Sequence, residues 1–138
     1  MCIIDKVVME IEKLLKFCKE WLSAWTGNIP EKLLSYYAEN AYYQDPAFPK
    51  GLVGHEQILP YFEKLLSGNP SWKWELEELF KTEKGFVFKW KATIPVGSKI
   101  LSEKGMDIVE LENKKISRNE VYFDRFDLLT TIRELKTM

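Results

Sequence analysis

The sequence predicts an α+β fold, with helices grouped ahead of a curved antiparallel sheet, and two observations indicate it. Apolar residues recur every three or four positions over residues 4–25 and again over 54–67, as in helices that bury one face. After Pro70 the period changes to two, as in half-buried strands. Helices followed by a run of antiparallel strands are typical of α+β domains. A length of 138 residues suits one domain over residues 1–138.

The first helix is expected over residues 4–25, with one buried apolar stripe. Trp21 should lie at the margin of that stripe, and Cys18 should be an inert core thiol. The stripe comprises Ile4, Val7, Val8, Ile11, Leu14, Leu15, Cys18, Leu22 and Trp25. Pro30 suits the first position of a second helix over residues 31–37, because a helix leaves that N–H unpaired in any case.

An early strand is expected over residues 41–45. A period of two places Ala41, Tyr43 and Asp45 on one of its faces. The prolines and glycine within residues 46–53 indicate a loop.

The remaining elements are a third helix, an antiparallel meander and a last helix. The third helix should cover residues 54–67, with His55 exposed in its first turn, and Asp127 should cap the last helix. The expected limits are 72–77, 86–94, 101–112 and 116–126 for the strands and 128–135 for the last helix. Glu78 breaks the alternation, which favours a β-bulge over an inward carboxylate. A sheet of this length on a long helix must curl, so it should enclose a cavity suited to a small molecule.

Composition and charge exclude several classes of function. A net charge of −1 gives no overall field to attract nucleic acid or an anionic membrane, so neither is expected as a partner. Cys2 and Cys18 cannot make a disulfide framework, and His55 has no companion at metal-ligand spacing, so no metal and no cofactor are expected. No signal peptide is recognisable, and no apolar run approaches the ~18 residues that span a bilayer. A soluble cytoplasmic protein is therefore the expectation.

Asp45 and Asp107 are the candidate catalytic residues. Asp45 ends the early strand, and Asp107 lies within a later strand on the face that carries core residues. Carboxyl groups in different environments can divide roles, one as an ionised base and the other as a protonated hydrogen-bond donor. The alternatives are structural. Asp45 before Pro46 suits an ordinary strand-end turn, and Asp107 could bond a lysine such as Lys89 or Lys91 on a neighbouring strand.

Aromatic residues are candidates for lining a ligand pocket, and the alternative for most of them is an ordinary place in the core. They are Trp21, Trp25, Tyr37, Tyr43, Phe62, Trp74, Phe88, Trp90 and Phe123. Trp21 and Tyr37 matter most, because each has a polar atom that needs a partner when it is buried. One face of the last long strand is polar and suits a pocket rim, a dimer face or a solvated face. That face carries Arg118, Glu120, Tyr122 and Asp124.

Several stretches, in this order along the chain, carry a family resemblance. They are Trp21-Leu22-Ser23-Ala24-Trp25, Leu34-Ser35-Tyr36-Tyr37-Ala38-Glu39-Asn40-Ala41, Tyr43-Gln44-Asp45-Pro46, Gly105-Met106-Asp107 and Glu120-Val121-Tyr122-Phe123-Asp124-Arg125. On these residues the chain resembles the SnoaL-like branch of the nuclear transport factor 2-like superfamily, which also holds ketosteroid isomerase and the polyketide cyclases. The resemblance implies a cone-shaped fold: a strongly curved, mainly antiparallel sheet around a long N-terminal helix, with a deep pocket between them. It also implies a homodimer formed through the sheet.

The resemblance to ketosteroid isomerase implies roles for individual residues. Asp45 falls on that enzyme's general base, Asp107 on the acid of its oxyanion hole, and Tyr37 on a tyrosine of the supporting network. Two positions depart from the pattern. Trp21 replaces the main oxyanion tyrosine, and Phe62 replaces a second network tyrosine, so one donor is altered and another is lost.

Functions of different classes follow from this resemblance. The first is binding of an apolar or cyclic carbonyl compound, with cofactor-free proton transfer in an isomerisation, cyclisation or dehydration. Asp45 would be the base, and Asp107 with Trp21 would steady the enolate oxygen. The second is non-catalytic ligand binding or protein interaction through the same cone. The third is epoxide hydrolysis, which needs an aspartate–arginine–aspartate set, and Arg118 and Arg125 are the central arginines.

Overall fold

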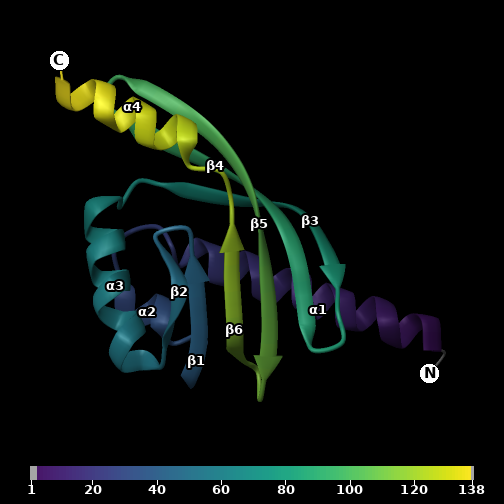
Figure 1. Cartoon of the computed structure of the whole chain (residues 1–138). Coiled ribbons are helices and arrows are strands. Elements are labelled where there is room, and N and C mark those ends of the chain that lie inside the picture. The colour runs from purple at the N-terminus through teal and green to yellow at the C-terminus, as the bar shows by residue number, and fades with distance from the viewer. Residues whose placement is uncertain (1–2, 138) are drawn as a thin grey trace.

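A strongly bent six-stranded sheet forms the body of the molecule, with a long helix packed along one side (Figure 1). The structure is a computed structural model that describes residues 3–137, so Cys2 lies outside the described residues. The elements are α1 (Ile3–Ser23), α2 (Pro30–Leu34), β1 (Tyr37–Asp45), β2 (Phe48–Val53), α3 (His55–Gly68), β3 (Lys73–Lys81), β4 (Gly85–Val96), β5 (Lys99–Glu112), β6 (Lys115–Tyr122) and α4 (Phe126–Thr137). The sheet order is β2-β1-β6-β5-β4-β3, and only the β1–β6 pair is parallel among the pairs described. The predicted α+β class and mainly antiparallel sheet are confirmed.

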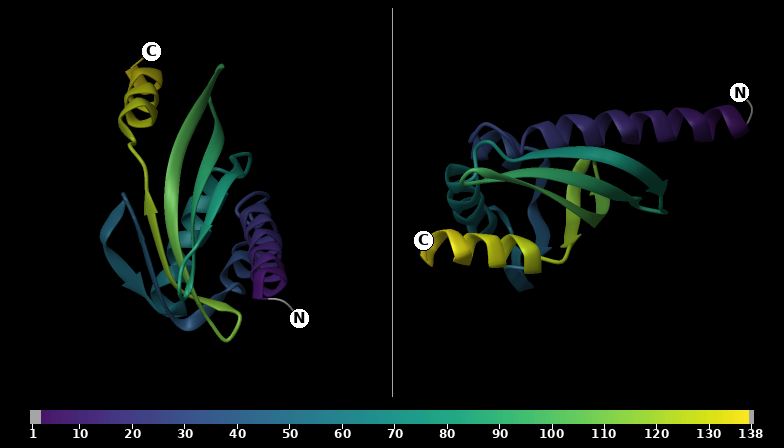
Figure 2. Two further views of the ribbon diagram at one scale, coloured as in Figure 1. Left: turned by 90° about the vertical axis from the view of Figure 1, so that its right-hand side faces the viewer. Right: turned by 90° about the horizontal axis from the view of Figure 1, so that it is seen from above.

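The helices cover the concave side of the sheet. α1 contacts β3, α3 contacts β1 and β2, and α4 contacts β4. The long strands β4 and β5 arch toward α4, as the views at right angles make clear (Figure 2). α4 thus lies at the end of the molecule away from the start of α1 (Figure 1).

The core lies between α1 and the concave face of the sheet. Every second side chain of β4 from Phe86 to Ile94 is at most 3% exposed, as the alternating pattern predicts. From α1, Cys18 and Trp21 are fully buried and Leu22 nearly so. Trp21 is therefore inside the core, not at the margin of the stripe where it was expected.

The first half of α1 does not bury its apolar stripe, contrary to the prediction. Ile4 is 71% exposed, and Val7 and Val8 are 42% and 48% exposed. The helix continues past the hairpin between β3 and β4, so no strand lies beneath these turns (Figure 2). Periodicity correctly indicates the helix here, but it does not show where the sheet ends.

The segment before the cavity differs from the prediction at two places. α2 ends at Leu34, and Tyr37, expected in that helix, begins β1 and pairs with Ile116 of β6. The predicted loop over residues 46–53 is wrong, because residues 48–53 form the edge strand β2 against β1. An edge strand tolerates a proline such as Pro49, whose missing N–H costs no ladder bond on the free side.

The end of the chain confirms one local prediction and corrects another. The register of β3 against β4 shifts between Leu76 and Glu78, which confirms the expected bulge. α4 begins at Phe126, and its first N–H is accepted by Asp124 Oδ1 at 2.8 Å, so Asp124 caps the helix in place of Asp127. Among residues 3–137, no helix combines the length and apolar character that crossing a membrane requires.

Candidate functional site

A cavity of about 260 Å³ lies between the concave face of the sheet and α4. All the strands except β2 contribute to its wall, together with α3, α4 and the end of α1. Seven of the predicted site residues line it: Trp25, Tyr43, Asp45, Trp74, Trp90, Asp107 and Phe123. The volume is just below the ~300–1,000 Å³ of pockets for drug-sized ligands, so the cavity suits a compact molecule.

Asp45 is fixed at the end of β1 by hydrogen bonds to both of its carboxylate oxygens. Oδ1 accepts from the backbone N–H groups of Ala47 (2.8 Å) and Phe48 (3.1 Å). Oδ2 accepts from the Tyr43 hydroxyl at 2.8 Å and from the Tyr61 hydroxyl. The first pair is the turn arrangement that Asp before Pro favours. The second pair comes from β1 and α3, so the carboxylate joins the turn to the cavity wall.

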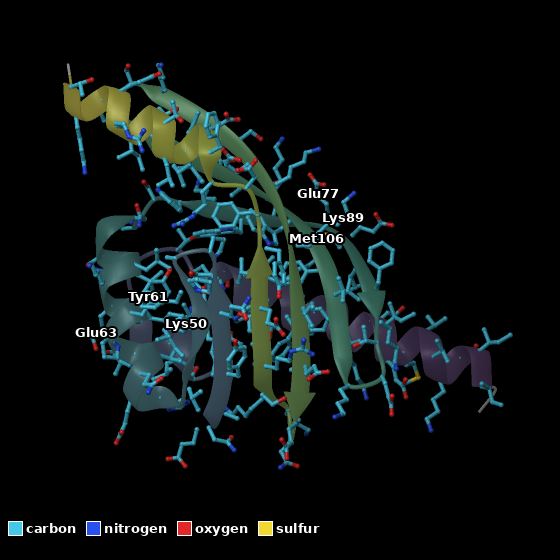
Figure 3. The ribbon with its side chains drawn as sticks, viewed as in Figure 1. Lys50, Tyr61, Glu63, Glu77, Lys89 and Met106 are labelled. Carbon is cyan, nitrogen blue, oxygen red and sulfur yellow. The ribbon has the colours of Figure 1, made fainter. Side chains whose placement is uncertain are left out.

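The two tyrosines remain hydrogen-bond donors to Asp45. Burial, foremost, and the charge of Asp45 raise the pKa of Tyr43 well above its ordinary value. The same two causes raise the pKa of Tyr61, and the positive charge of Arg125 opposes the rise in part. Figure 3 shows Tyr61 between α3 and the strands β1 and β2. Both hydroxyls therefore keep their protons throughout the neutral range.

Asp107 lies in the middle of β5 and faces the cavity. Its side chain is 4% exposed and accepts two hydrogen bonds, from Trp90 Nε1 to Oδ1 (2.7 Å) and from Asn119 Nδ2 to Oδ2 (3.0 Å). The predicted alternative, a bond to Lys89 or Lys91, is wrong. Both lysines are exposed, because they alternate with the buried residues of β4 and so point to the other face of the sheet.

The environment of Asp107 makes its carboxyl group a weak acid. Burial raises its pKa to about 7, the hydrogen bonds from Asn119 and Trp90 oppose the rise, and the charge of Asp45 adds to it. A carboxyl group with a pKa near neutrality can either accept or donate a proton under physiological conditions.

A glycine makes the bond from Trp90 to Asp107 possible. Gly105 is the register partner of Trp90 across β4 and β5. A Cβ atom on Gly105 would lie 2.2 Å from Cζ2 of the indole, so the ring occupies the space that a side chain would need. The indole therefore lies against β5, and its N–H reaches Asp107, two residues further along that strand.

A buried chain of hydrogen bonds leads away from Asp107. The resemblance implies a network role for Tyr37, but it gives none to Asn119 or His55, which also take part. Asn119, which is fully buried, accepts from the Tyr37 hydroxyl at 2.8 Å while its own amide donates to Asp107. The backbone carbonyl of Tyr37 lies 2.9 Å from Nε2 of His55. The expected exposure of His55 is therefore wrong, since its ring is half-buried and joins α3 to β1. In the sequence, the one sign of the role of Asn119 is its position on the inward face of its strand.

The other four predicted binding residues form an aromatic layer behind the cavity wall and are absent from its lining. They are Trp21, Tyr37, Phe62 and Phe88. Their rings meet edge to face, as with Trp21 and Phe88 at 5.6 Å between centroids. Trp21 Nε1 has no hydrogen-bond partner among the described residues. Burial, foremost, raises the pKa of Tyr37 well above its ordinary value, and the charges of Asp107 and Asp45 add to the rise.

The two central arginines have different surroundings. Arg118 lies on the outer face, where it pairs with Glu120 and with Glu110 at 3.5 Å. Arg125 lines the cavity, which brings one arginine onto the same wall as Asp45 and Asp107. Sequence reasoning left Arg125 without a definite place, because it follows the end of β6 and precedes α4.

Sequence reasoning also missed a group of cavity residues from α3, the segment that follows it and α4. They are Tyr61, Leu65, Asn69, Trp72, Leu128, Leu129 and Ile132. The pattern of α4 shows a short amphipathic helix but does not reveal which part of the sheet it covers. Within residues 3–137, His, Cys, Asp and Glu side chains form no group of three or more that could hold a metal ion.

Comparison with known proteins places the fold. A model of the SnoaL-like domain matches residues 18–119. One similar structure is a protein from Catenulispora acidiphila DSM 44928 with a ketosteroid isomerase-like fold, in complex with trimethylamine (TM-score 0.74, 15% identity, 85% of this chain and 92% of that one). A second is TerC, co-crystallized with polyporic acid (TM-score 0.72, 13% identity, 86% and 97%). A third is a candidate SnoaL-like polyketide cyclase from Jannaschia sp. CCS1 (TM-score 0.73, 11% identity, 88% and 92%). No curated protein matches the sequence. At these identities the solved structures show a shared fold alone.

Proposed function

The chain belongs to the SnoaL-like domain family, and from that premise we propose that its cavity binds a compact, largely apolar carbonyl compound and moves a proton next to the carbonyl group. One observation carries this proposal above the others. Asp45 and Asp107 line a single aromatic cavity, yet Asp45 is held by four donors and Asp107 by two. Two carboxyl groups in unlike surroundings are suited to act as a base and an acid in one reaction.

The proposed chemistry is proton transfer without a cofactor. The Asp45 carboxylate takes a proton from the carbon next to the carbonyl, and the electrons of that C–H bond move to the carbonyl oxygen as an enolate. Asp107 in its protonated form donates a hydrogen bond to this oxygen. Where the substrate has a C=C bond attached to that carbon, the enolate is a dienolate, and return of the proton from Asp45 to its far carbon, with re-formation of the carbonyl, completes an isomerisation with atoms and electrons balanced. Trp21 has no part in this scheme, because it does not line the cavity.

Asp45 must free an acceptor site before it can take a proton, because a carboxylate has about four such sites. The hydroxyl of Tyr61 is the group that can move, since this half-buried side chain stands on α3. The backbone donors at Ala47 and Phe48 belong to the turn itself and are fixed. We therefore assign Tyr61 as the donor that yields when substrate enters.

Structures of the same fold support a small organic ligand. One contains trimethylamine and another was co-crystallized with polyporic acid. Neither identifies the compound that this chain binds, so the test should use a carbonyl compound chosen for its chemistry.

Hydrogen–deuterium exchange next to a carbonyl tests the proposal without knowledge of the product. The probe is 2-tetralone in D₂O, followed by proton NMR with and without the protein. We expect the wild type to accelerate exchange at the α-carbon, and Asp45→Asn to reduce that acceleration by ~10²–10⁴, the usual contribution of a general base. Asp5→Asn is the matched control, because Asp5 is exposed on α1. Exchange that Asp45→Asn leaves unchanged in a folded protein contradicts the assignment of the base.

Ligand binding without catalysis is the second candidate function. It is favoured by the four donors that occupy Asp45, two of which belong to the turn. Under this alternative, 2-tetralone quenches the fluorescence of the cavity tryptophans while its exchange stays at the solvent rate. Acceleration that depends on Asp45 excludes it.

We also propose that the chain forms a homodimer through the outer face of the sheet. Met106 and Tyr122 are register partners on that face and are 41% and 48% exposed. Lys89 pairs with Met106 on its other side, and both are labelled in Figure 3. Sedimentation equilibrium should find a dimer for the wild type and a monomer for Met106→Glu, with Ile4→Glu, at an exposed position of α1 away from the sheet's outer face, as the control. A monomeric wild type contradicts the proposal.

A further inference from the structure

The cavity contains one cationic side chain, and the proposed proton transfer does not use it. Among the described residues that line the cavity, Arg125 alone carries a positive charge. It lies between the end of β6 and the start of α4, and its side chain is half-buried. The rest of the wall is mostly aromatic and aliphatic, with the two aspartates as its negative groups.

Arg125 has no acidic partner within residues 3–137. The ion pairs of this region join Arg118 to Glu110 and Glu120, and Lys99 to Glu134. The neighbouring Asp124 is occupied as the cap of α4. A half-buried guanidinium without a counter-ion has lost part of its hydration with no protein charge in return, so an anion in the cavity would find an unsatisfied partner.

Arg125 faces the same volume as the proposed base. Its positive charge lowers the pKa of Tyr61, whose hydroxyl donates a hydrogen bond to Asp45. A ligand held at Arg125 by one end would therefore have its other atoms among the aromatic walls near Asp45. The planar guanidinium can form two parallel bonds to a carboxylate, which fixes orientation as well as position.

From these contacts we infer that Arg125 anchors an anionic group of the ligand, so the compound that the cavity takes is a compact aromatic or cyclic molecule bearing a carboxylate or a similarly acidic group. The inference rests on the proposed binding function and specifies its ligand class. It does not depend on whether proton transfer occurs.

A matched pair of probes tests the anchor directly. The two compounds are 2-naphthoate and 2-naphthamide, which share a ring system and differ in charge. Binding is followed by quenching of tryptophan fluorescence, because Trp25, Trp72, Trp74 and Trp90 line the cavity. The wild type should bind the carboxylate about tenfold to a hundredfold more tightly than the amide, the range expected for hydrogen bonds between charged groups.

Variants at position 125 separate charge from fold. Arg125→Gln should abolish the preference and leave the affinity for 2-naphthamide within about twofold of the wild-type value, whereas Arg125→Lys should keep part of it because the charge remains without the planar fork. Arg133→Gln, which removes an exposed arginine from the adjoining helix α4, should leave the preference intact. Near-ultraviolet circular dichroism checks that each variant is folded.

Three results overturn the anchor: equal or tighter binding of the amide by the wild type, a preference that survives in Arg125→Gln, or no binding of either probe at millimolar concentration. The proposed proton transfer fails separately. A carboxylate preference with no exchange of 2-tetralone supports the anchor and rejects the catalytic proposal. Asp45-dependent exchange of 2-tetralone without any carboxylate preference supports the catalytic proposal and rejects the anchor.

Discussion

Asp45 and Asp107 reach the same cavity from two regions of the sheet that are built differently. At the turn between β1 and β2, Asp45 accepts two bonds from backbone N–H groups close to it in sequence and two from tyrosines. In the middle of β5, Asp107 accepts two bonds from side chains on β4 and β6. Three of the four donors to Asp45 thus lie within three residues of it in the chain, and only Tyr61 is distant, whereas the support of Asp107 depends on the register of three strands.

Removing Asp45 should have the largest effect on stability. Asp45→Ala leaves two tyrosine hydroxyls and two backbone N–H groups without their acceptor. Unsatisfied buried donors cost about 1–3 kcal/mol each, and water entering the cavity offsets part of this, so we expect a loss of roughly 3–5 kcal/mol. Urea unfolding measures it, with the exposed Asp5→Ala as the control. A loss below about 1 kcal/mol would show that these bonds do not hold the turn.

The next largest effect should be a change of folding stability with pH that comes from Asp107. Its pKa is raised from 3.8 to about 7 in the folded protein, so the folded state binds a proton more tightly than the unfolded state. The stabilising contribution is full below pH ~4 and is lost as the pH rises through about 7, which amounts to roughly 4 kcal/mol.

Asp107→Asn isolates this contribution from other titrating groups. Between pH 4 and pH 7 the wild type should lose stability relative to this variant, in urea unfolding curves recorded at each pH. Equal pH profiles for the two proteins would mean that Asp107 titrates as an ordinary aspartate.

The smallest expected effect comes from the donor to Asp107. Trp90→Phe keeps an aromatic ring in the wall and removes one hydrogen bond, at a cost of about 1–2 kcal/mol. Because that bond lowers the pKa of Asp107, its loss should raise the pKa further, which carboxyl NMR titration detects. Trp72→Phe is the control, since Trp72 lines the cavity and its ring bonds no carboxylate among the described residues. An unchanged pKa in Trp90→Phe would mean that the neighbouring strand does not support the Asp107 carboxylate.

The fold was largely predictable, because the main elements follow from periodicity. The alternation of β4 identifies its buried face, and the break at Glu78 identifies the bulge. The edge strand over residues 48–53 escaped prediction, since proline and glycine normally indicate a loop and an edge strand tolerates both. The exposed start of α1 escaped it too, because amphipathicity does not say how far the partner surface extends.

Many of the residues that line the cavity could be predicted from the sequence, but the hydrogen-bond partners of these residues could not. Asp45 and Asp107 do line one cavity, but the partner of Asp107 is an asparagine on β6 where a lysine on β4 was considered. A period of two gives the face of a strand, and only the register gives its neighbours. Asn119 and Arg125 lay beyond sequence reasoning for this reason, one depending on pairing and the other on the path of the chain into α4.

The contact between Gly105 and Trp90 ties together two positions that are far apart in the chain. Any side chain at 105 would push the indole away from β5, and a smaller residue at 90 would leave Asp107 without its donor whatever stood at 105. Substitutions at the two positions should therefore be epistatic, each tolerated or not according to the other. As related cavities diverge, the absence of a side chain at position 105 of β5 therefore decides whether β4 can supply a hydrogen-bond donor to the acid at position 107.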